Sequence, residues 1–140
     1  MKILLAVDGS PYSKKMLAYL STHESLLNGK NDFTVFTAQA ALPPRARAAV
    51  GKTIVDTYYA EESEKVLAPV SKFLLRHGID AKSQWKVGPA GATIAKLATE
   101  GNFDLVVMGS HGHGAVLSMV MGSVANQVLA HCKVPVLLVR

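Results

Sequence analysis

Short apolar runs alternate along the chain with longer segments in which apolar residues recur at intervals of three and four. The apolar runs predict five strands, at residues 2–7, 33–40, 81–87, 105–108 and 134–139. The segments between them predict helices at residues 11–22, 54–77 and 90–99, and a last helix that follows Ser123. Because strands and helices alternate, we expect an α/β fold: an open five-stranded parallel sheet of Rossmann-like type with helices on both faces.

Serine, glycine and proline residues set the expected ends of these elements. Ser10 is expected to cap the first helix, with Pro11 at its first position. Prolines predict a loop over residues 41–47. Pro69 is expected to kink or divide the long helix, and Gly78 is expected to end it.

Length and composition place the chain among globular proteins. With 140 residues, 49% of them hydrophobic and 18% charged, residues 1–140 are expected to form a single domain. The first apolar run stops at Asp8, and no segment reaches about 18 consecutive apolar residues, so no signal peptide or membrane span is expected. Cys132 is the single cysteine, which excludes an internal disulfide, agrees with a cytoplasmic location and predicts a packed residue.

The net charge of +5 comes from scattered basic residues, and no run of five or six like charges occurs. Aromatic residues are 6% of the chain and are not interleaved with the basic ones, which argues against a nucleic-acid surface. The charge favours a general attraction for small anions.

A cluster of glycines follows the fourth predicted strand. Gly109, Gly112 and Gly114 come directly after it, and the pair Gly122–Ser123 precedes the last helix. Glycines let the backbone approach a ligand closely, and a helix N-terminus offers unpaired N–H groups to an anion, so this arrangement suits a phosphate site. Asp8 ends the first strand, at the edge where open α/β sheets bind ligands, although Asp-Gly is also a common turn pair.

The spacing of these residues excludes several known motifs. Residues 51–53 read Gly-Lys-Thr like the end of a Walker P-loop, but the required earlier glycine is Ala46. A dinucleotide fingerprint needs a glycine three residues after Gly114, where the chain has Leu117. A Gly-x-Ser-x-Gly nucleophile elbow is absent. No enzyme motif fits.

His111 and His113 form a possible metal pair. Zinc needs three or four protein ligands, and no neighbouring Cys, Asp or Glu in the sequence completes the set. A protein-only metal site is therefore not predicted.

The spacing that does fit a known pattern is Gly109-x2-Gly112-x9-Gly122-Ser123. Here the sequence resembles the universal stress protein family, in its ATP-binding branch, whose phosphate motif is Gly-x2-Gly-x9-Gly-Ser/Thr. Further blocks with this resemblance begin at Val7, Val87, Asp104 and Val134, so that it covers the whole chain. The family resemblance implies an adenine nucleotide α-hydrolase-like fold.

The resemblance also implies a site for ATP across the carboxyl ends of the first and fourth strands, with Mg²⁺ or Mn²⁺ carried on the phosphates. The residues implied toward the adenosine are Asp8, Ala6, Val7 and Ala38, with Met108 and Gly109 beside the ribose. The residues implied toward the phosphates are Gly112, His113, Gly122, Ser123 and Val124. Independently of the resemblance, a serine at a helix start can donate a hydroxyl and an N–H to an anion, or can simply cap the helix.

Three positions depart from the family pattern: Ala6 replaces a common proline, Thr37 a frequent histidine, and His113 a common basic residue. Because unperturbed histidine titrates near pH ~6.5, the residue at 113 predicts a phosphate affinity that is weaker than in relatives or rises as the pH falls.

Three functions remain open from the sequence. The leading expectation is an ATP-binding regulatory or stress-response protein, a homodimer through the last strand, Val134 to Val139, and not a dedicated enzyme. The second is a slow ATPase or nucleotide-processing enzyme, for which His111 is the nearby candidate general base. The third is a dimeric interaction module that binds no nucleotide.

Overall fold

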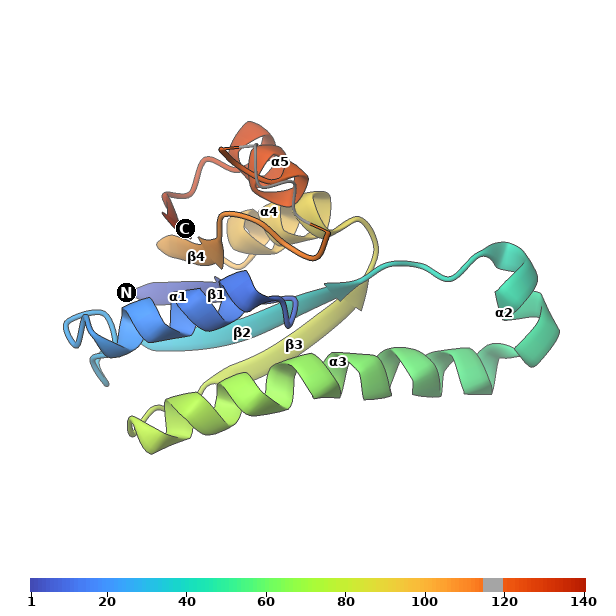
Figure 1. The fold of residues 1–140 in the computed structure, drawn as a ribbon, viewed down its shortest axis with the longest axis horizontal. Coiled ribbons are helices and arrows are strands. Elements are labelled where there is room, and N and C mark those ends of the chain that lie inside the picture. Colours follow the sequence, from blue (N-terminus) through green and yellow to red (C-terminus); the bar gives the residue numbers. More distant parts are fainter. Residues whose placement is uncertain (115–119) are drawn as a thin grey trace.

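The computed structural model describes residues 1–114 and 120–140 as a five-stranded sheet with helices on both faces (Figure 1). The elements in chain order are β1 (Lys2–Ala6), α1 (Pro11–Ser21), β2 (Asp32–Gln39), α2 (Pro44–Val50), α3 (Lys52–Arg76), β3 (Lys82–Val87), α4 (Ala90–Glu100), β4 (Leu105–Gly109), α5 (Ser123–His131) and β5 (Val136–Val139). The strand order is β3-β2-β1-β4-β5, and every neighbouring pair is parallel. The predicted fold class is confirmed.

β1 lies at the centre of the sheet and is buried on both faces. Ile3, Leu4 and Leu5 are at most 1% exposed. Because side chains alternate along a strand, Ile3 and Leu5 pack with α1 and α3 on one face, whereas Leu4 packs with α4 and α5 on the other. Two apolar cores therefore hold the carboxyl ends of β1 and β4 in a fixed relation (Figure 1).

Prolines predicted a loop over residues 41–47, but α2 begins at Pro44, so the prediction was wrong from that residue on. Pro44 occupies a first-turn position of α2, where its missing N–H costs nothing and its φ suits a helix. None of the residues of α2 is buried. A helix without a buried stripe leaves no apolar periodicity in the sequence from which it can be recognised.

α3 continues through Pro69 as one helix of 25 residues, about 37 Å long, and is not divided there. Pro69 is exposed, so the carbonyl of Lys65 that it leaves unpaired lies on the solvent side of the helix. Gly78, with φ +75°, follows the C-cap and ends the helix as predicted.

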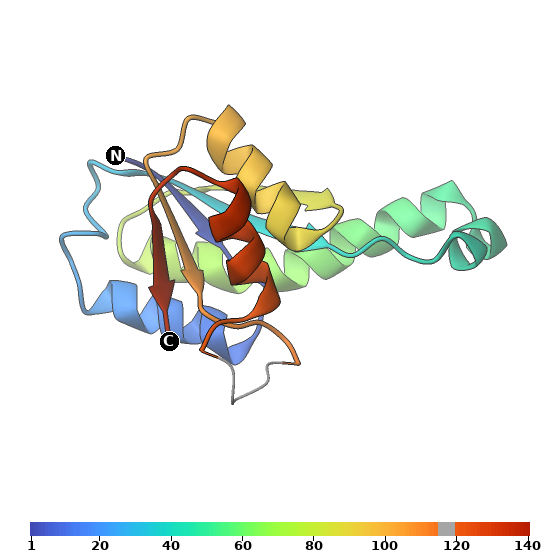
Figure 2. The ribbon, with the colours of Figure 1, turned by 90° about the horizontal axis from the view of Figure 1, so that it is seen from above.

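The first half of α3 and the whole of α2 extend beyond the sheet on the side opposite β5 (Figure 2). Tyr59 ties this extension to the chain that leaves β2, because its hydroxyl accepts a 2.8 Å hydrogen bond from the N–H of Leu42. No helix within the described ranges is long and apolar enough to cross a membrane.

Three smaller expectations have different outcomes. Ser10 is at the N-cap position of α1, but its buried hydroxyl makes no hydrogen bond within the described part of the chain, so side-chain capping was a wrong prediction. Cys132 is buried against the core that contains α4 and α5, as expected for a packed residue. β5 begins at Val136, two residues later than predicted, because Pro135 has no N–H for the ladder.

Candidate functional site

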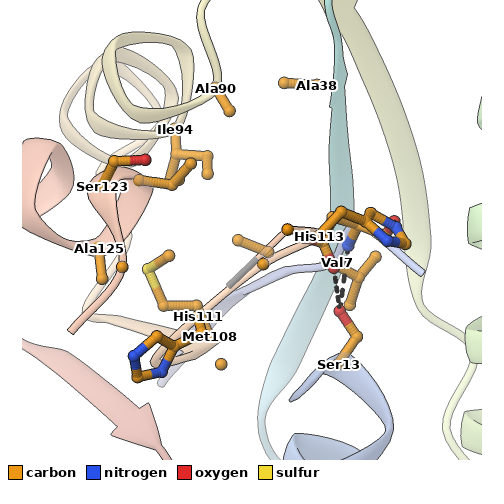
Figure 3. Close-up of a pocket in the computed structure, with 17 residues that line it drawn as sticks. Val7, Ser13, Ala38, Ala90, Ile94, Met108, His111, His113, Ser123 and Ala125 are labelled. Atoms are coloured by element: carbon orange, nitrogen blue, oxygen red, sulfur yellow. Dashed lines mark hydrogen bonds between the residues drawn. The ribbon is translucent and has the colours of Figure 1, made fainter. Parts of the chain in front are cut away.

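A cavity of about 240 Å³ lies where β1 and β4 end and α5 begins (Figure 3). All eleven site residues predicted from the sequence line this one cavity: Ala6, Val7, Asp8, Ala38, Met108, Gly109, Gly112, His113, Gly122, Ser123 and Val124. The strand order explains this grouping, because β1 lies between β2 and β4 and brings their carboxyl ends together.

Six further residues line the cavity: Ser13, Ala90, Ile94, His111, Gly114 and Ala125. Sequence reasoning treated His111 only as a possible ligand or base, and Ile94 only as part of a helix face. Ser13 was missed altogether. Its position five residues after Asp8, on the first turn of α1, was the available signal.

Asp8 is held by the start of α1. Its Oδ1 accepts hydrogen bonds of 2.9 Å from the Ser10 N–H and 2.9 Å from the Ser13 hydroxyl. The Ser13 oxygen in turn accepts the Asp8 N–H at 3.1 Å. Oδ1 is therefore fully engaged, and the carboxylate is fixed in one orientation.

The other carboxylate oxygen of Asp8 lies against Gly112. A Cβ built on Gly112 would stand 2.6 Å from Asp8 Oδ2, a distance that real Cβ atoms do not tolerate. Gly122 is similarly close to the backbone of the loop after β4, because its Cβ would stand 3.1 Å from His111 Cα. Glycine at these two motif positions lets three chain segments meet around the cavity.

His113 joins the loop after β4 to the end of β1. Its Nε2 lies 2.7 Å from the carbonyl oxygen of Asp8, as Figure 3 shows from the side of the cavity. A carbonyl only accepts, so Nε2 carries the proton and donates. The imidazole thus has a structural contact in addition to any contact with a ligand.

None of the seventeen described residues that line the cavity is a lysine or arginine. The beginning of α5 lies at the cavity, and the first N–H groups of a helix have no partner within it, so they are candidate donors. Gly122 is the N-cap residue and Ser123 is the first helical residue, so Ser123 is not simply the cap. Its hydroxyl remains a candidate donor to an anion.

His111 is the second imidazole at the cavity. Its Nδ1 lies 2.8 Å from the Ser110 hydroxyl, and its ring lies 4.9 Å from the ring of Tyr12. Within the described ranges, no three His, Cys, Asp or Glu side chains gather closely enough to hold a metal ion.

The sequence of this chain matches a known protein family over its full length. The model of the family described as "Universal stress protein family" matches residues 1–140. The chain belongs to the universal stress protein family. A universal stress protein of Thermus aquaticus is 31% identical over 139 residues, which cover 99% of this chain and 97% of the relative.

Other members of the family are longer than this chain. Universal stress protein Slr1230 of Synechocystis is 32% identical over 139 residues, 99% of this chain but only 42% of that relative. The chain therefore spans less than half the length of this relative.

Solved structures of the family share the fold. Protein MJ0577 of Methanocaldococcus jannaschii superposes with a TM-score of 0.82 at 23% identity, covering 99% of this chain and 94% of the other. Some of these structures contain adenine nucleotides. Among them are an Arabidopsis thaliana member with AMP (TM-score 0.70, 16% identity, 99% and 90% coverage) and an Archaeoglobus fulgidus member with dAMP (TM-score 0.66, 22% identity, 100% and 98% coverage).

Proposed function

We propose that this universal stress protein binds ATP and acts as a nucleotide-dependent regulator in the stress response. The observation that carries the proposal is the meeting of Gly112, Gly122 and Ser123 with Asp8 around one cavity. Relatives of the same fold that hold AMP and dAMP support an adenine nucleotide as the ligand class.

A nucleotide needs hydrogen-bond donors for its phosphates and an apolar surface for its base, and the cavity offers both at different places. One end has the glycine loop, Ser123 and the start of α5, which suit phosphates. Away from Ser123, the lining has the small apolar side chains of Ala38 and Ala90 (Figure 3). An apolar wall of this kind suits the face of a purine base.

We further propose that Mg²⁺ or Mn²⁺ accompanies the phosphates. The lining has no lysine or arginine to balance a triphosphate, and Asp8 adds a negative charge. Magnesium commonly binds through substrate phosphates and water with few protein ligands, which fits a chain with no three-ligand cluster among its described residues.

Binding of Mg-ATP is expected to raise the thermal stability of the protein. At a free concentration of ten times Kd, a ligand that binds only the folded state adds about 1.4 kcal/mol to the free energy of unfolding. The measurement is a melting curve with Mg-ATP, with ATP plus EDTA, with adenosine and with Mg-tripolyphosphate. We expect the largest shift with Mg-ATP, and the purified protein should release an adenine nucleotide on chromatography. If Mg-ATP at millimolar concentration leaves the melting curve unchanged, the module that binds no nucleotide is the correct function.

The proposal includes binding and excludes dedicated catalysis. His111 was the nearby candidate for a general base, and its Nδ1 is within hydrogen-bond distance of Ser110 while its ring packs beside Tyr12. Both contacts fix the orientation of the ring, and Mg-ATP binding without turnover in the wild type would support binding alone. We place this function in the cytoplasm, where a lone buried thiol such as Cys132 stays reduced.

We also propose a homodimer in which β5 of one copy pairs with β5 of a second copy. β5 is at the end of the strand order, and the carbonyls of Pro135 and Val139 accept hydrogen bonds from the neighbouring β4. Since peptide groups alternate in direction along a strand, those of Val136 and Leu138 are directed toward the open edge.

Leu138→Pro is therefore expected to convert the dimer to a monomer while β5 keeps its pairing with β4, because proline removes an N–H from the open edge only. Sedimentation or light scattering measures the mass, and circular dichroism checks that the variant is folded. A folded variant with the mass of a dimer would contradict pairing through β5.

A further inference from the structure

A second hollow, of about 360 Å³, adjoins the apolar end of the nucleotide cavity. Ala38 and Ala90 line both spaces, so the two adjoin at these residues. The remaining lining residues of the hollow are Ala40, Ala41, Gly88 and Pro89. No side chain in this lining is larger than that of proline.

The hollow is built from fixed backbone. Gly88 closes the end of the β2–β3 pair by donating its N–H to the carbonyl of Gln39 at 2.9 Å. Pro89 is the N-cap residue of α4, which packs on the sheet through its buried residues. Ala40 and Ala41 leave β2 toward α2, so the chain runs away from the hollow (Figure 2). The space is a consequence of this route of the chain and of the absence of long side chains along it.

The chemistry of a bound purine decides what the hollow faces. With the phosphates at the start of α5, the ribose and then the base extend toward Ala38 and Ala90. Adenine is attached to the ribose through N9, and its opposite edge carries the exocyclic amine at C6. An extended base therefore directs this amine past Ala38 and Ala90, toward the second hollow.

We propose that the hollow accommodates an apolar substituent on the exocyclic amine, so that the protein binds N6-substituted adenine nucleotides as well as ATP. This inference rests on the proposed function. A cavity closed at the end that receives the base would reject an N6 substituent by steric overlap. The second hollow would instead let the protein accept such nucleotides. The wall residues offer apolar surface and no charge, which matches an alkyl or aryl substituent.

The experiment compares ATP with N6-benzyl-ATP by isothermal titration calorimetry, with Mg²⁺ present throughout. The wild type is expected to bind N6-benzyl-ATP within about threefold of ATP or more tightly, because the pocket has room for the added group. Ala41→Phe fills the hollow from an exposed loop position and should weaken N6-benzyl-ATP by about tenfold or more while leaving ATP unchanged. Ala48→Phe, on the exposed surface of α2 away from the hollow, is the matched control and should change neither affinity.

The outcomes separate the two proposals. If ATP binds and N6-benzyl-ATP binds more than tenfold more weakly to the wild type, the second hollow does not receive the substituent. If Ala41→Phe and Ala40→Phe both bind N6-benzyl-ATP with the affinity of the wild type, the substituent lies elsewhere. That result would also overturn the inference. If neither nucleotide binds, the proposed function itself is wrong.

Discussion

Gly112→Val is expected to lower the affinity for Mg-ATP by about 10- to 100-fold, which corresponds to an overpacking cost of about 1–3 kcal/mol. A Cβ at this position would stand 2.6 Å from Asp8 Oδ2. The carboxylate cannot swing aside cheaply, because Oδ1 is held by the Ser10 N–H and the Ser13 hydroxyl. The loop that carries Gly112 must move instead, and the cavity changes shape. Titration calorimetry with Mg-ATP measures the loss.

Gly29→Val is the matched control for this variant. Gly29 is exposed and has no positive φ, and a Cβ added to it would meet nothing within 4 Å, so its substitution should leave the affinity unchanged. A double-mutant cycle tests the mechanism further: Gly112→Ala should cost less in an Asp8→Ala background, where the overlapping carboxylate is absent. Equal costs in the two backgrounds would contradict the contact with Asp8 as the cause.

Gly109→Val is expected to lower the free energy of unfolding by about 3 kcal/mol or more, at the upper end of overpacking costs. The added Cβ would stand 2.7 Å from Tyr12 Cβ and 3.0 Å from the Tyr12 carbonyl carbon. These atoms belong to the first turn of α1, and backbone cannot rotate away as a long side chain can. The whole helix would have to shift from β4, against which it packs. Urea unfolding followed by circular dichroism measures the change.

Gly29→Val serves again as the control, with an expected change within about 0.5 kcal/mol, as is usual for surface positions. A loss below about 1 kcal/mol for Gly109→Val would show that α1 moves away from β4 easily. Comparison with Gly112→Val separates the two motif glycines: Gly109 serves the packing of the fold, and Gly112 serves the shape of the cavity.

The sheet was predictable because most of its strands carry continuous apolar runs. β1 is buried on both faces, and a strand of this kind has a sequence that differs clearly from a turn. α2 was not predictable, because it has no buried residue and its proline pair resembles a loop signal. The cap at Ser10 failed for another reason: local bonds compete with it, because Asp8 Oδ1 accepts the Ser10 N–H and the Ser10 carbonyl accepts the N–H groups of Ser13 and Lys14.

The predicted site residues came from the family resemblance, which rested on the spacing of the glycine motif. The residues that were missed adjoin the site through contacts that form only in the folded chain. Ser13 reaches the cavity by its bond to Asp8. The second hollow brings together the chain after β2 and the chain after β3, where the Gly88 N–H bonds to the carbonyl of Gln39. Such neighbours can be identified only from the folded structure.

The composition of the cavity lining determines which substitutions can alter the cavity. Its described lining combines main-chain groups and small side chains with larger ones such as Met108 and Ile94, and it includes no lysine or arginine. The shape of the cavity therefore depends on loop length and on glycine at positions 112 and 122, where an added Cβ would crowd neighbouring atoms. Side chains elsewhere can diverge widely while the fold persists, as the TM-score of 0.82 to a protein only 23% identical shows for the fold as a whole.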